Sequence, residues 1–262
     1  MPDPLCTLAA VRLDDVPEIG QLTADAFAGD RQTQMKSLGR EAYDMNSITR
    51  ESLPSMLHNP RCIAIKVVDE DTGDIMGVCN WGFRGFKPEE MPKMEGKPPP
   101  PAEKKPREAG ADSEDEKQQQ QQHATDGNGK QGPDQEKEET DPIARLQART
   151  GADLEAWMEE VMPQGTRCLF IIGLSVSPKY QGRGVGSALL RWGTDICNRH
   201  GAFAWVHSSE PAWPLYEKCG FQTIRSLDID LDEYAPAPPP NEGPDAKWGH
   251  YVFRYMKYFG SK

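Results

Sequence analysis

The sequence is short of apolar residues, and this shortage limits how much of the chain can form a core. Hydrophobic residues make up 37% of the 262 residues, and the mean hydropathy is −0.71. No apolar run approaches the length that spans a bilayer, and Met1–Pro4 lacks the basic start of a signal peptide. We therefore expect a soluble protein of the cytoplasm, with the nucleus as the alternative, and no contact with a membrane.

Clustered positive charge is also lacking. The net charge is −11, the calculated pI is near 5.0, and no basic stripe is present that could bind phosphate backbones, so we expect no nucleic-acid partner. The cysteines do not have the short spacing of a zinc cluster, and we expect no metal site and a reduced protein. The six cysteines are Cys6, Cys62, Cys79, Cys168, Cys197 and Cys219.

The segment from about residue 87 to 141 has almost no apolar residues. It contains a proline run, Pro98–Pro101, and a glutamine run, Gln118–Gln122, and its 15 acidic and 9 basic residues carry about six of the eleven net negative charges. Such a composition cannot bury enough surface to offset chain entropy. We therefore predict one domain over residues 1–262, interrupted at about 87–141 by a disordered low-complexity insert.

Apolar runs and turn signals on both sides of this segment predict an α/β fold (α+β, with a mixed sheet). Expected helices begin at Asp14–Glu18 and cover Glu51–Leu57, Asp153–Met162, Ser187–His200 and Pro211–Cys219. Expected strands are Leu5–Leu13, Cys62–Val68, Ile75–Phe83, Cys168–Val176, Ala202–His207, Thr223–Leu231 and His250–Tyr258. The second and third strands form a hairpin, and the fourth and fifth are parallel because a helix connects them. The result is a central twisted mixed sheet with helices on its faces.

The most informative stretch is a glycine-rich loop, Gln181–Gly186, between an apolar strand and a helix. Glycines let backbone N–H groups approach a ligand, and the helix N-terminus attracts an anion, so we expect a phosphate or pyrophosphate site. The lysine of a Walker loop is missing, and Ser187 replaces the third glycine of a dinucleotide fingerprint. A glycine-rich turn without a ligand is the alternative.

Two segments together carry a family resemblance. Gln181–Gly186 resembles the Gln/Arg-x-x-Gly-x-Gly/Ala signature of the GNAT (GCN5-related) N-acetyltransferase superfamily, and Leu215–Phe221 resembles its second hallmark. Ala188–Gly193 further resembles a fungal-type branch. The resemblance is strong over Cys168–Leu227, rests on topology alone over Leu5–Phe83, and excludes the insert.

The resemblance implies the GNAT fold, acetyl-CoA as co-substrate and an amine acceptor, and it leaves the oligomeric state open. Coenzyme A would lie where the strands at Leu174–Val176 and Ala204–His207 separate. Backbone groups of Leu174 and Val176 would hold its pantetheine arm, and amides of Arg183–Ser187 would hold its pyrophosphate. The expected cofactor-binding residues are Leu174, Ser175, Val176, Gln181, Gly182, Arg183, Gly184, Val185, Gly186, Ser187 and Ser209.

Acetyl transfer to an amine also needs an acid, a base and an oxyanion donor. Tyr216 is the candidate acid, since a phenol stays protonated at neutral pH and can protonate a thiolate; a packed aromatic residue is the alternative. Many family members carry Glu or His on the strand corresponding to Leu169–Gly173, and this chain does not. The candidate bases are therefore His207, then Glu210, then a water relay. Backbone N–H near Val176 is the expected oxyanion donor.

Two serines and the acceptor complete the predictions. Ser208 and Ser209 are expected to cap the following helix, and Ser209 also to touch the cofactor. We expect direct transfer, in a ternary complex, to a primary amine of a small molecule. The alternatives are a protein or peptide N-acetyltransferase, which needs an open groove, and a catalytically degenerate acyl-CoA-binding sensor.

Overall fold

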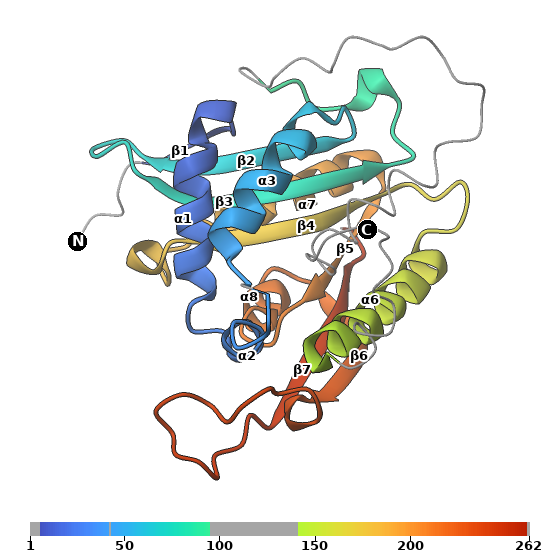
Figure 1. Cartoon of the computed structure of the whole chain (residues 1–262). Coiled ribbons are helices and arrows are strands. Elements are labelled where there is room, and N and C mark those ends of the chain that lie inside the picture. Colours follow the sequence, from blue (N-terminus) through green and yellow to red (C-terminus); the bar gives the residue numbers. More distant parts are fainter. Residues whose placement is uncertain (1–5, 42, 95–140, 261–262) are drawn as a thin grey trace, which may run out of the picture.

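The computed structural model describes residues 6–41, 43–94 and 141–260, which form one sheet with helices on both faces (Figure 1). The elements are, in chain order, β1 (Cys6–Ala10), η1 (Leu13–Asp15), α1 (Val16–Phe27), α2 (Arg31–Lys36), α3 (Met45–His58), β2 (Cys62–Asp69), β3 (Ile75–Arg84), η2 (Pro88–Glu90), α6 (Pro142–Val161), β4 (Cys168–Val176), η3 (Pro178–Tyr180), α7 (Val185–His200), β5 (Phe203–Ser208), α8 (Trp213–Lys218), β6 (Gln222–Asp230), η4 (Leu231–Glu233) and β7 (His250–Tyr258).

The seven strands follow the order β1-β2-β3-β4-β5-β7-β6. All neighbours are antiparallel except β4 and β5, which are parallel because α7 connects them. The mixed sheet and the parallel pair confirm the predicted fold class. The parallel ladder is short: it runs from Cys168 opposite Phe203 to Ile171 opposite Val206 and then stops, although both strands continue.

A β-bulge lies in β4 just beyond this point. Trp81 of β3 pairs with Ile171 and Asn80 pairs with Gly173, so Ile172 is the extra residue. Beyond the bulge, the alternation of the β4 side chains between the two faces of the sheet is reversed. Phe170 and Ile172 pack in the core beneath α1, α3 and α6, whereas Leu174, two residues on, packs in the core beneath α7.

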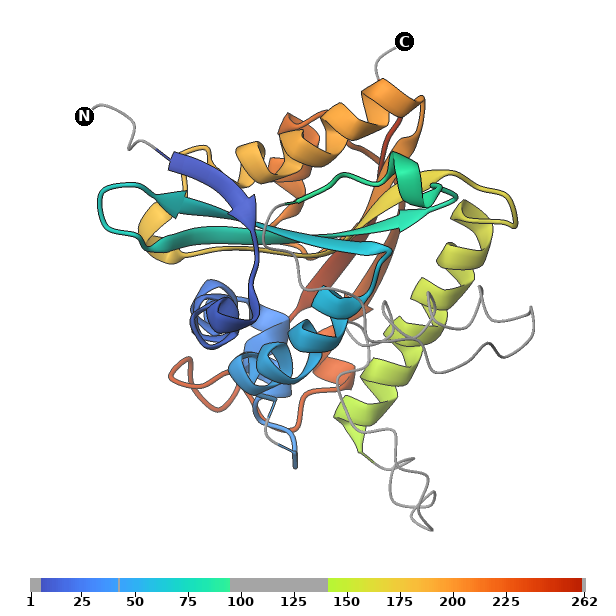
Figure 2. The same ribbon diagram turned by 90° about the horizontal axis from the view of Figure 1, so that it is seen from above.

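The helices form two layers, best seen from above (Figure 2). α7 and α8 cover one face of the sheet, where Leu189, Leu190 and Tyr216 join the larger core cluster. α1, α3 and α6 cover the other face, where Ile19, Leu53 and other apolar residues form a second cluster. A third, smaller cluster joins α2 and the start of α6 to β6 and β7.

Most predicted elements are present, but several helices differ. The strand predictions Cys168–Val176 and His250–Tyr258 match β4 and β7 to the residue. The six-residue helix α2 was not predicted, and α3 begins at Met45, six residues before the predicted start. Helix α6 begins at Pro142, capped by Asp141, rather than at Asp153. Asp141 is also the predicted end of the low-complexity insert, so the helix starts where that composition ends.

The core of the predicted insert, residues 95–140, lies outside the described residues. Its first residues are described and belong to the fold: Glu90 forms an ion pair with Arg167 at 3.0 Å, and Met91 and Met94 pack on the larger core cluster. The predicted boundary at residue 87 is therefore too early.

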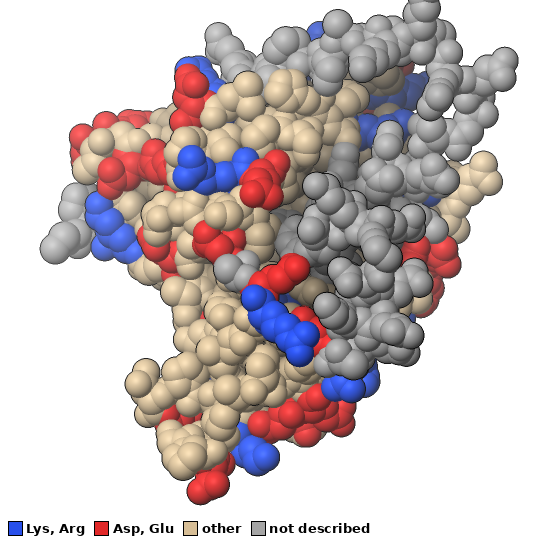
Figure 3. Space-filling view, viewed as in Figure 1, with Lys and Arg blue, Asp and Glu red and all other residues tan. Residues whose placement is uncertain are grey.

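Charge is mixed on the face seen in Figure 3, where acidic and basic side chains are interspersed over α1 and α3. Within residues 6–41, 43–94 and 141–260, no helix is both long enough and apolar enough to cross a bilayer.

Candidate active site

The described part of the chain contains a cavity of about 200 Å³. Its walls come from α1, α2, α3 and α6 on one face of the sheet, from β3, β4, β5 and β7, and from Tyr216 of α8. The cavity brings together five of the predicted site residues, namely Leu174, Ser175, His207, Ser209 and Tyr216. The residues of the glycine-rich loop do not line it, so the predicted phosphate site lies apart from the predicted reaction centre.

The separation of β4 and β5 leaves backbone groups of β4 without a strand partner on that side. The Ser177 N–H donates to the Met76 carbonyl of β3 at 3.0 Å, so Ser177 faces β3. Because alternate residues of a strand direct their backbone groups to opposite sides, Leu174 and Val176 face the β5 side, where the ladder has ended. The Val176 carbonyl there accepts a bond of 3.1 Å from the Gln181 side chain. An extended ligand could pair with these groups as an added strand.

The glycine-rich loop positions the N-terminus of α7. Gly182 and Gly184 have φ of +75° and +85°, a region that glycine adopts without steric cost, and a Cβ at either would meet no atom within 4 Å. Gly184 is the N-cap of α7, and no side chain caps the helix there. The first N–H groups of this 16-residue helix therefore remain available for an anion beside an exposed loop.

One loop glycine has a packing role. A Cβ at Gly186 would lie 2.7 Å from Leu215 Cδ2 of α8, so this glycine allows α7 and α8 to pack closely. The start of the loop is anchored to the β2–β3 hairpin. Tyr180 donates to Asp74 at 2.8 Å, and the Lys179 ammonium lies 2.7 Å from the same carboxylate.

Tyr216 is buried, and its ring packs edge-on against Phe221 at 5.6 Å. Its hydroxyl makes no hydrogen bond to another described residue. Burial, followed by the nearby Cys79 and Cys219, raises the pKa of Tyr216 well above its ordinary value of 10. The phenol is therefore protonated at neutral pH and borders the cavity, as the proposed acid must.

His207 lies on the cavity wall with its ring against Phe253 and Tyr255, both at 4.7 Å between ring centroids. Burial is the main cause that lowers the pKa of His207 to about 4; Asp153 opposes it, and Arg225 and Lys36 act in the same direction as burial. The imidazole is therefore neutral at pH 7. Its Nε2 is buried and has no hydrogen-bond partner among the described residues.

The predictions for the segment between β5 and α8 are partly wrong. Helix α8 begins at Trp213, its N-cap is Ala212, and no side chain caps it, so neither Ser208 nor Ser209 is a cap. The Ser208 hydroxyl instead donates to the Ser209 carbonyl at 2.9 Å. Glu210, the second candidate base, is not among the cavity-lining residues, and its N–H donates to the Tyr251 hydroxyl at 3.2 Å.

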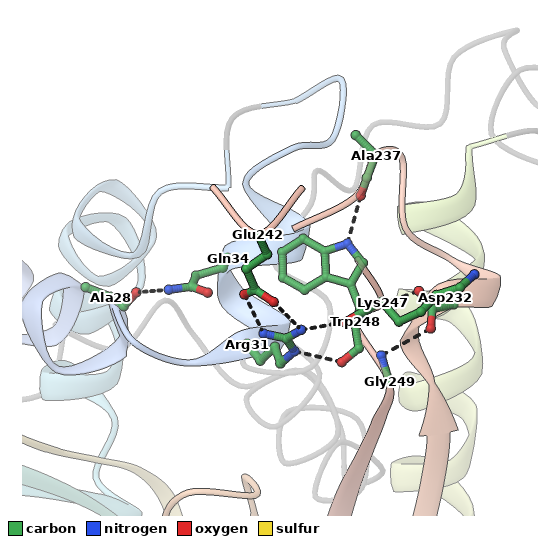
Figure 4. A network of polar contacts seen from close by, with 9 residues as sticks. All are labelled: Ala28, Arg31, Gln34, Asp232, Ala237, Glu242, Lys247, Trp248 and Gly249. Carbon is green, nitrogen blue, oxygen red and sulfur yellow. Dashed lines mark hydrogen bonds and ion pairs between the residues drawn. The ribbon is translucent and has the colours of Figure 1, made fainter. Parts of the chain in front are cut away.

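The short helix α2 forms one wall of the cavity and is held by two groups of bonds. Its N-cap, Asp30, is buried and accepts from the Thr33 N–H at 2.8 Å, from the Thr33 hydroxyl at 2.8 Å and from Tyr251 at 2.7 Å. Arg31 binds the loop before β7 through the Lys247 and Trp248 carbonyls and Glu242 (Figure 4). The indole of Trp248 donates to the Ala237 carbonyl, which fixes the loop in turn.

Sequence reasoning missed the polar residues on the side of the cavity that faces α1 to α3. Asn80 of β3 and Thr49 of α3 are buried and line the cavity, as do Asp30 and Lys36 of α2. Asn80 had a detectable signal, since it is an amide inside the apolar stretch Ile75–Phe83. The others lie in polar segments that reach the cavity only through the tertiary fold.

Comparison with known proteins agrees with the fold. Residues 102–221 match the sequence model of the acetyltransferase (GNAT) family, a range that includes both motifs and begins within the predicted insert. The polyamine N-acetyltransferase of Drosophila melanogaster, described as forming N-acetylagmatine, is 15% identical with a TM-score of 0.55, and the match covers 97% of this chain and 100% of that one. Arylalkylamine N-acetyltransferase 2 of Aedes aegypti is 13% identical with a TM-score of 0.57, covering 98% and 99%.

A mosquito arylalkylamine N-acetyltransferase-like protein, 5b, is similar to the same degree. It is 14% identical, with a TM-score of 0.54 and coverage of 97% of this chain and 99% of that one. At identities of 13–15%, these structures show a similarity of fold alone. The match to the family model is a similarity of sequence, and it includes the glycine-rich loop. Over residues 102–221 the chain is similar to the acetyltransferase (GNAT) family, and its fold is that of the N-acetyltransferases compared above.

Proposed function

We propose that the protein transfers the acetyl group of acetyl-CoA directly to the primary amine of a small molecule. The observation that carries this proposal is that one cavity contains two parts. His207, Tyr216 and the end of β4 line the first part, and the second part, which we call the chamber, lies beneath α1, α2 and α3. A cavity of about 200 Å³ suits a small amine better than a peptide, which would need a longer groove. The match to the acetyltransferase (GNAT) family model supports acetyl transfer, and the named structural neighbours act on small amines.

The residues present fit acetyl-CoA. The uncapped N-terminus of α7, with open space at Gly182 and Gly184, suits the pyrophosphate. The backbone edge at Leu174 and Val176, which has no strand partner on the β5 side, suits the pantetheine arm. Bound there, acetyl-CoA supplies a thioester carbonyl and a thiolate leaving group to the cavity.

Tyr216 acts as the acid that protonates the departing thiolate. The same burial that raises the pKa of Tyr216 raises the pKa of the Cys79 thiol well above its usual value. A coenzyme thiol in this environment is shifted in the same direction, so the phenol remains able to protonate it. The Val176 N–H, which faces away from β3, is placed to donate to the negative charge developing on the carbonyl oxygen.

His207 orients the attacking amine and is a weak base. With a pKa of about 4 it is neutral at pH 7, so Nε2 can accept a hydrogen bond from an amine N–H. It cannot hold a proton for long at that pH, so the proton continues to water. The attacking nitrogen forms the new C–N bond as the C–S bond breaks.

Thiol release from acetyl-CoA, measured over small amines, polyamines and peptides, tests this function. The wild type should acetylate at least one small amine. Changing Tyr216 to Phe keeps the ring but removes the proton, so kcat should fall about 100-fold or more while acetyl-CoA affinity changes little. Equal loss of both would make Tyr216 a binding residue. Tight acetyl-CoA binding with no transfer to any amine would instead favour the acyl-CoA sensor.

A further inference from the structure

The acceptor side of the cavity contains buried polar atoms that have no partner. Thr49 Oγ1 from α3, Asn80 Oδ1 from β3 and His207 Nε2 from β5 are each buried and unbonded within the described part of the chain, and all three residues line the cavity. Thr49 and Asn80 are each only 8% exposed. Trp205 Nε1, which can only donate, is a fourth unbonded atom in the lining. Because buried polar groups are normally paired, this concentration in one cavity indicates a polar ligand, and the acceptor Asn80 Oδ1 calls for a hydrogen-bond donor on that ligand.

Asn80 is the most informative of these residues. It lies in the middle of β3, on the face covered by α1 and α3, and its neighbours on both sides are Cys79 and Trp81 of the core. A buried amide oxygen without a partner destabilises the fold, and an apolar side chain of similar size would pack there without that cost. Its position therefore indicates recognition of a ligand rather than stabilisation of the fold.

The charges of the lining restrict the ligand further. Asp30 is the only carboxylate among the described lining residues, and Thr33 and Tyr251 already donate three bonds to it. Lys36 of the same helix contributes a positive charge. A ligand with a second ammonium group would place it beside Lys36 or among apolar side chains, without a free counter-charge.

The remaining walls are largely apolar and aromatic, and the cavity is small. Phe27, Leu53, Met56 and Phe253 are among the lining side chains. The volume of about 200 Å³ is below the roughly 300–1,000 Å³ of pockets for drug-sized ligands. One amine on a compact apolar body fits these walls.

We propose that the acceptor is a monoamine with a compact apolar or aromatic body and one further hydrogen-bond donor, which Asn80 and Thr49 recognise. This inference rests on the proposed function for the identity of the ligand as an acetyl acceptor. In this arrangement the amine lies towards His207 and Tyr216, and the distal donor lies towards β3 and α3.

Calorimetry with three probes tests the proposal: 2-phenylethylamine, its 4-hydroxy derivative, and spermidine. The wild type should bind the hydroxylated monoamine more tightly than 2-phenylethylamine and should bind spermidine weakest. Asn80→Leu should weaken binding of the hydroxylated monoamine at least tenfold, about 1.4 kcal/mol, and should leave acetyl-CoA affinity unchanged. Its melting temperature should be no lower than that of the wild type, because the variant removes a buried amide oxygen that has no partner.

Two threonine variants serve as a second test and its control. Thr49→Val should weaken the hydroxylated monoamine as well. Thr194→Val changes a buried helical hydroxyl of α7 that bonds the Arg191 carbonyl at 3.1 Å and does not line the cavity, so it should bind all probes as the wild type does. The Thr49 variant keeps the test valid if Asn80→Leu fails to fold.

The outcomes separate this inference from the proposed function. Tighter binding of spermidine than of the monoamines, no binding of either monoamine, or wild-type binding by both the Asn80 and Thr49 variants would overturn the inference, even if acetyl transfer to amines is observed. Monoamine binding that depends on Asn80, without acetyl transfer, would support the chamber and contradict the transferase.

Discussion

Replacement of Gly184 by Val tests whether the N-terminus of α7 binds the pyrophosphate. Gly184 has φ of +85°, and a Cβ there would meet nothing within 4 Å, so the added side chain would be strained but would not clash. It would project into the open space beside the uncapped N–H groups. Any loss of acetyl-CoA affinity would then come from obstruction of the anion site or from a disturbed first helical turn.

The same helix supplies the control. Gly201, the C-cap of α7, has φ of +59° and an equally open Cβ position, but it lies at the opposite end of the helix. A non-glycine residue in the left-handed region costs about 1–2 kcal/mol, so both valine variants should lose similar stability. Only Gly184→Val should also lose acetyl-CoA affinity, by at least about tenfold or 1.4 kcal/mol.

Thermal unfolding and isothermal calorimetry with acetyl-CoA measure the two quantities separately. The expected result is two variants of similar melting temperature, of which one binds acetyl-CoA as the wild type does. Unchanged affinity in a folded Gly184→Val protein would refute the pyrophosphate assignment. Equal loss of affinity in both variants would show that the effect comes from strain in α7 rather than from the anion site.

Three further predictions follow from the packing, from His207 and from the predicted insert. Gly193→Val should lower the free energy of unfolding by about 1–3 kcal/mol in denaturant titrations, since its Cβ would lie 2.3 Å from the Trp81 ring. His207 has a pKa of about 4 in the fold against 6.5 for a free histidine, so the unfolded state binds the proton more readily and the free energy of unfolding should fall as the pH drops from 6.5 towards 4. His207→Phe, which keeps the ring contacts, should make the free energy of unfolding depend less on pH in this range. The same pH dependence in the variant and the wild type would contradict the assigned pKa. Replacing residues 95–140 with a short flexible linker should change the melting temperature by less than about 5 °C, and a larger fall would mean that this segment stabilises the domain.

The fold was largely predictable because its strands are apolar runs bounded by clear turn signals. β4 and β7 matched to the residue for this reason. Helix α2 was missed because six residues, Arg31–Lys36, are too few to show a helical period, and its stability comes from Asp30 as N-cap and from contacts far along the chain. The early start of α3 had a local signal in its N-cap, Asp44, whose side chain accepts from the Asn46 and Ser47 N–H groups.

The candidate site divides in the same way. The residues expected at the reaction centre, among them Tyr216 and His207, follow from motifs close together in the sequence, and the structure places both on one cavity. The chamber beneath α1 to α3 is lined by side chains from segments that are distant in the sequence, such as Thr49 and Asn80. No local sequence pattern indicates that these side chains lie close together. The low pKa of His207 has the same origin, because it follows from burial by elements that the sequence does not place beside it.

The bulge at Ile172 has a consequence for which changes β4 can accept. Before the bulge, Phe170 faces α1, α3 and α6, whereas after it Leu174 faces α7. β3 alternates without interruption, and its pairs Trp81–Ile171 and Cys79–Leu174 each keep both partners on the α7 face, so the extra residue Ile172 absorbs the change of phase. Removing Ile172 would therefore leave Ile171 and Gly173 opposite Trp81 and Asn80 as consecutive pairs, and Ser175 would stay on the side of the chamber. Within Cys168–Val176, Ile172 is the position at which the sheet can accept the loss of a residue without exchanging its two faces.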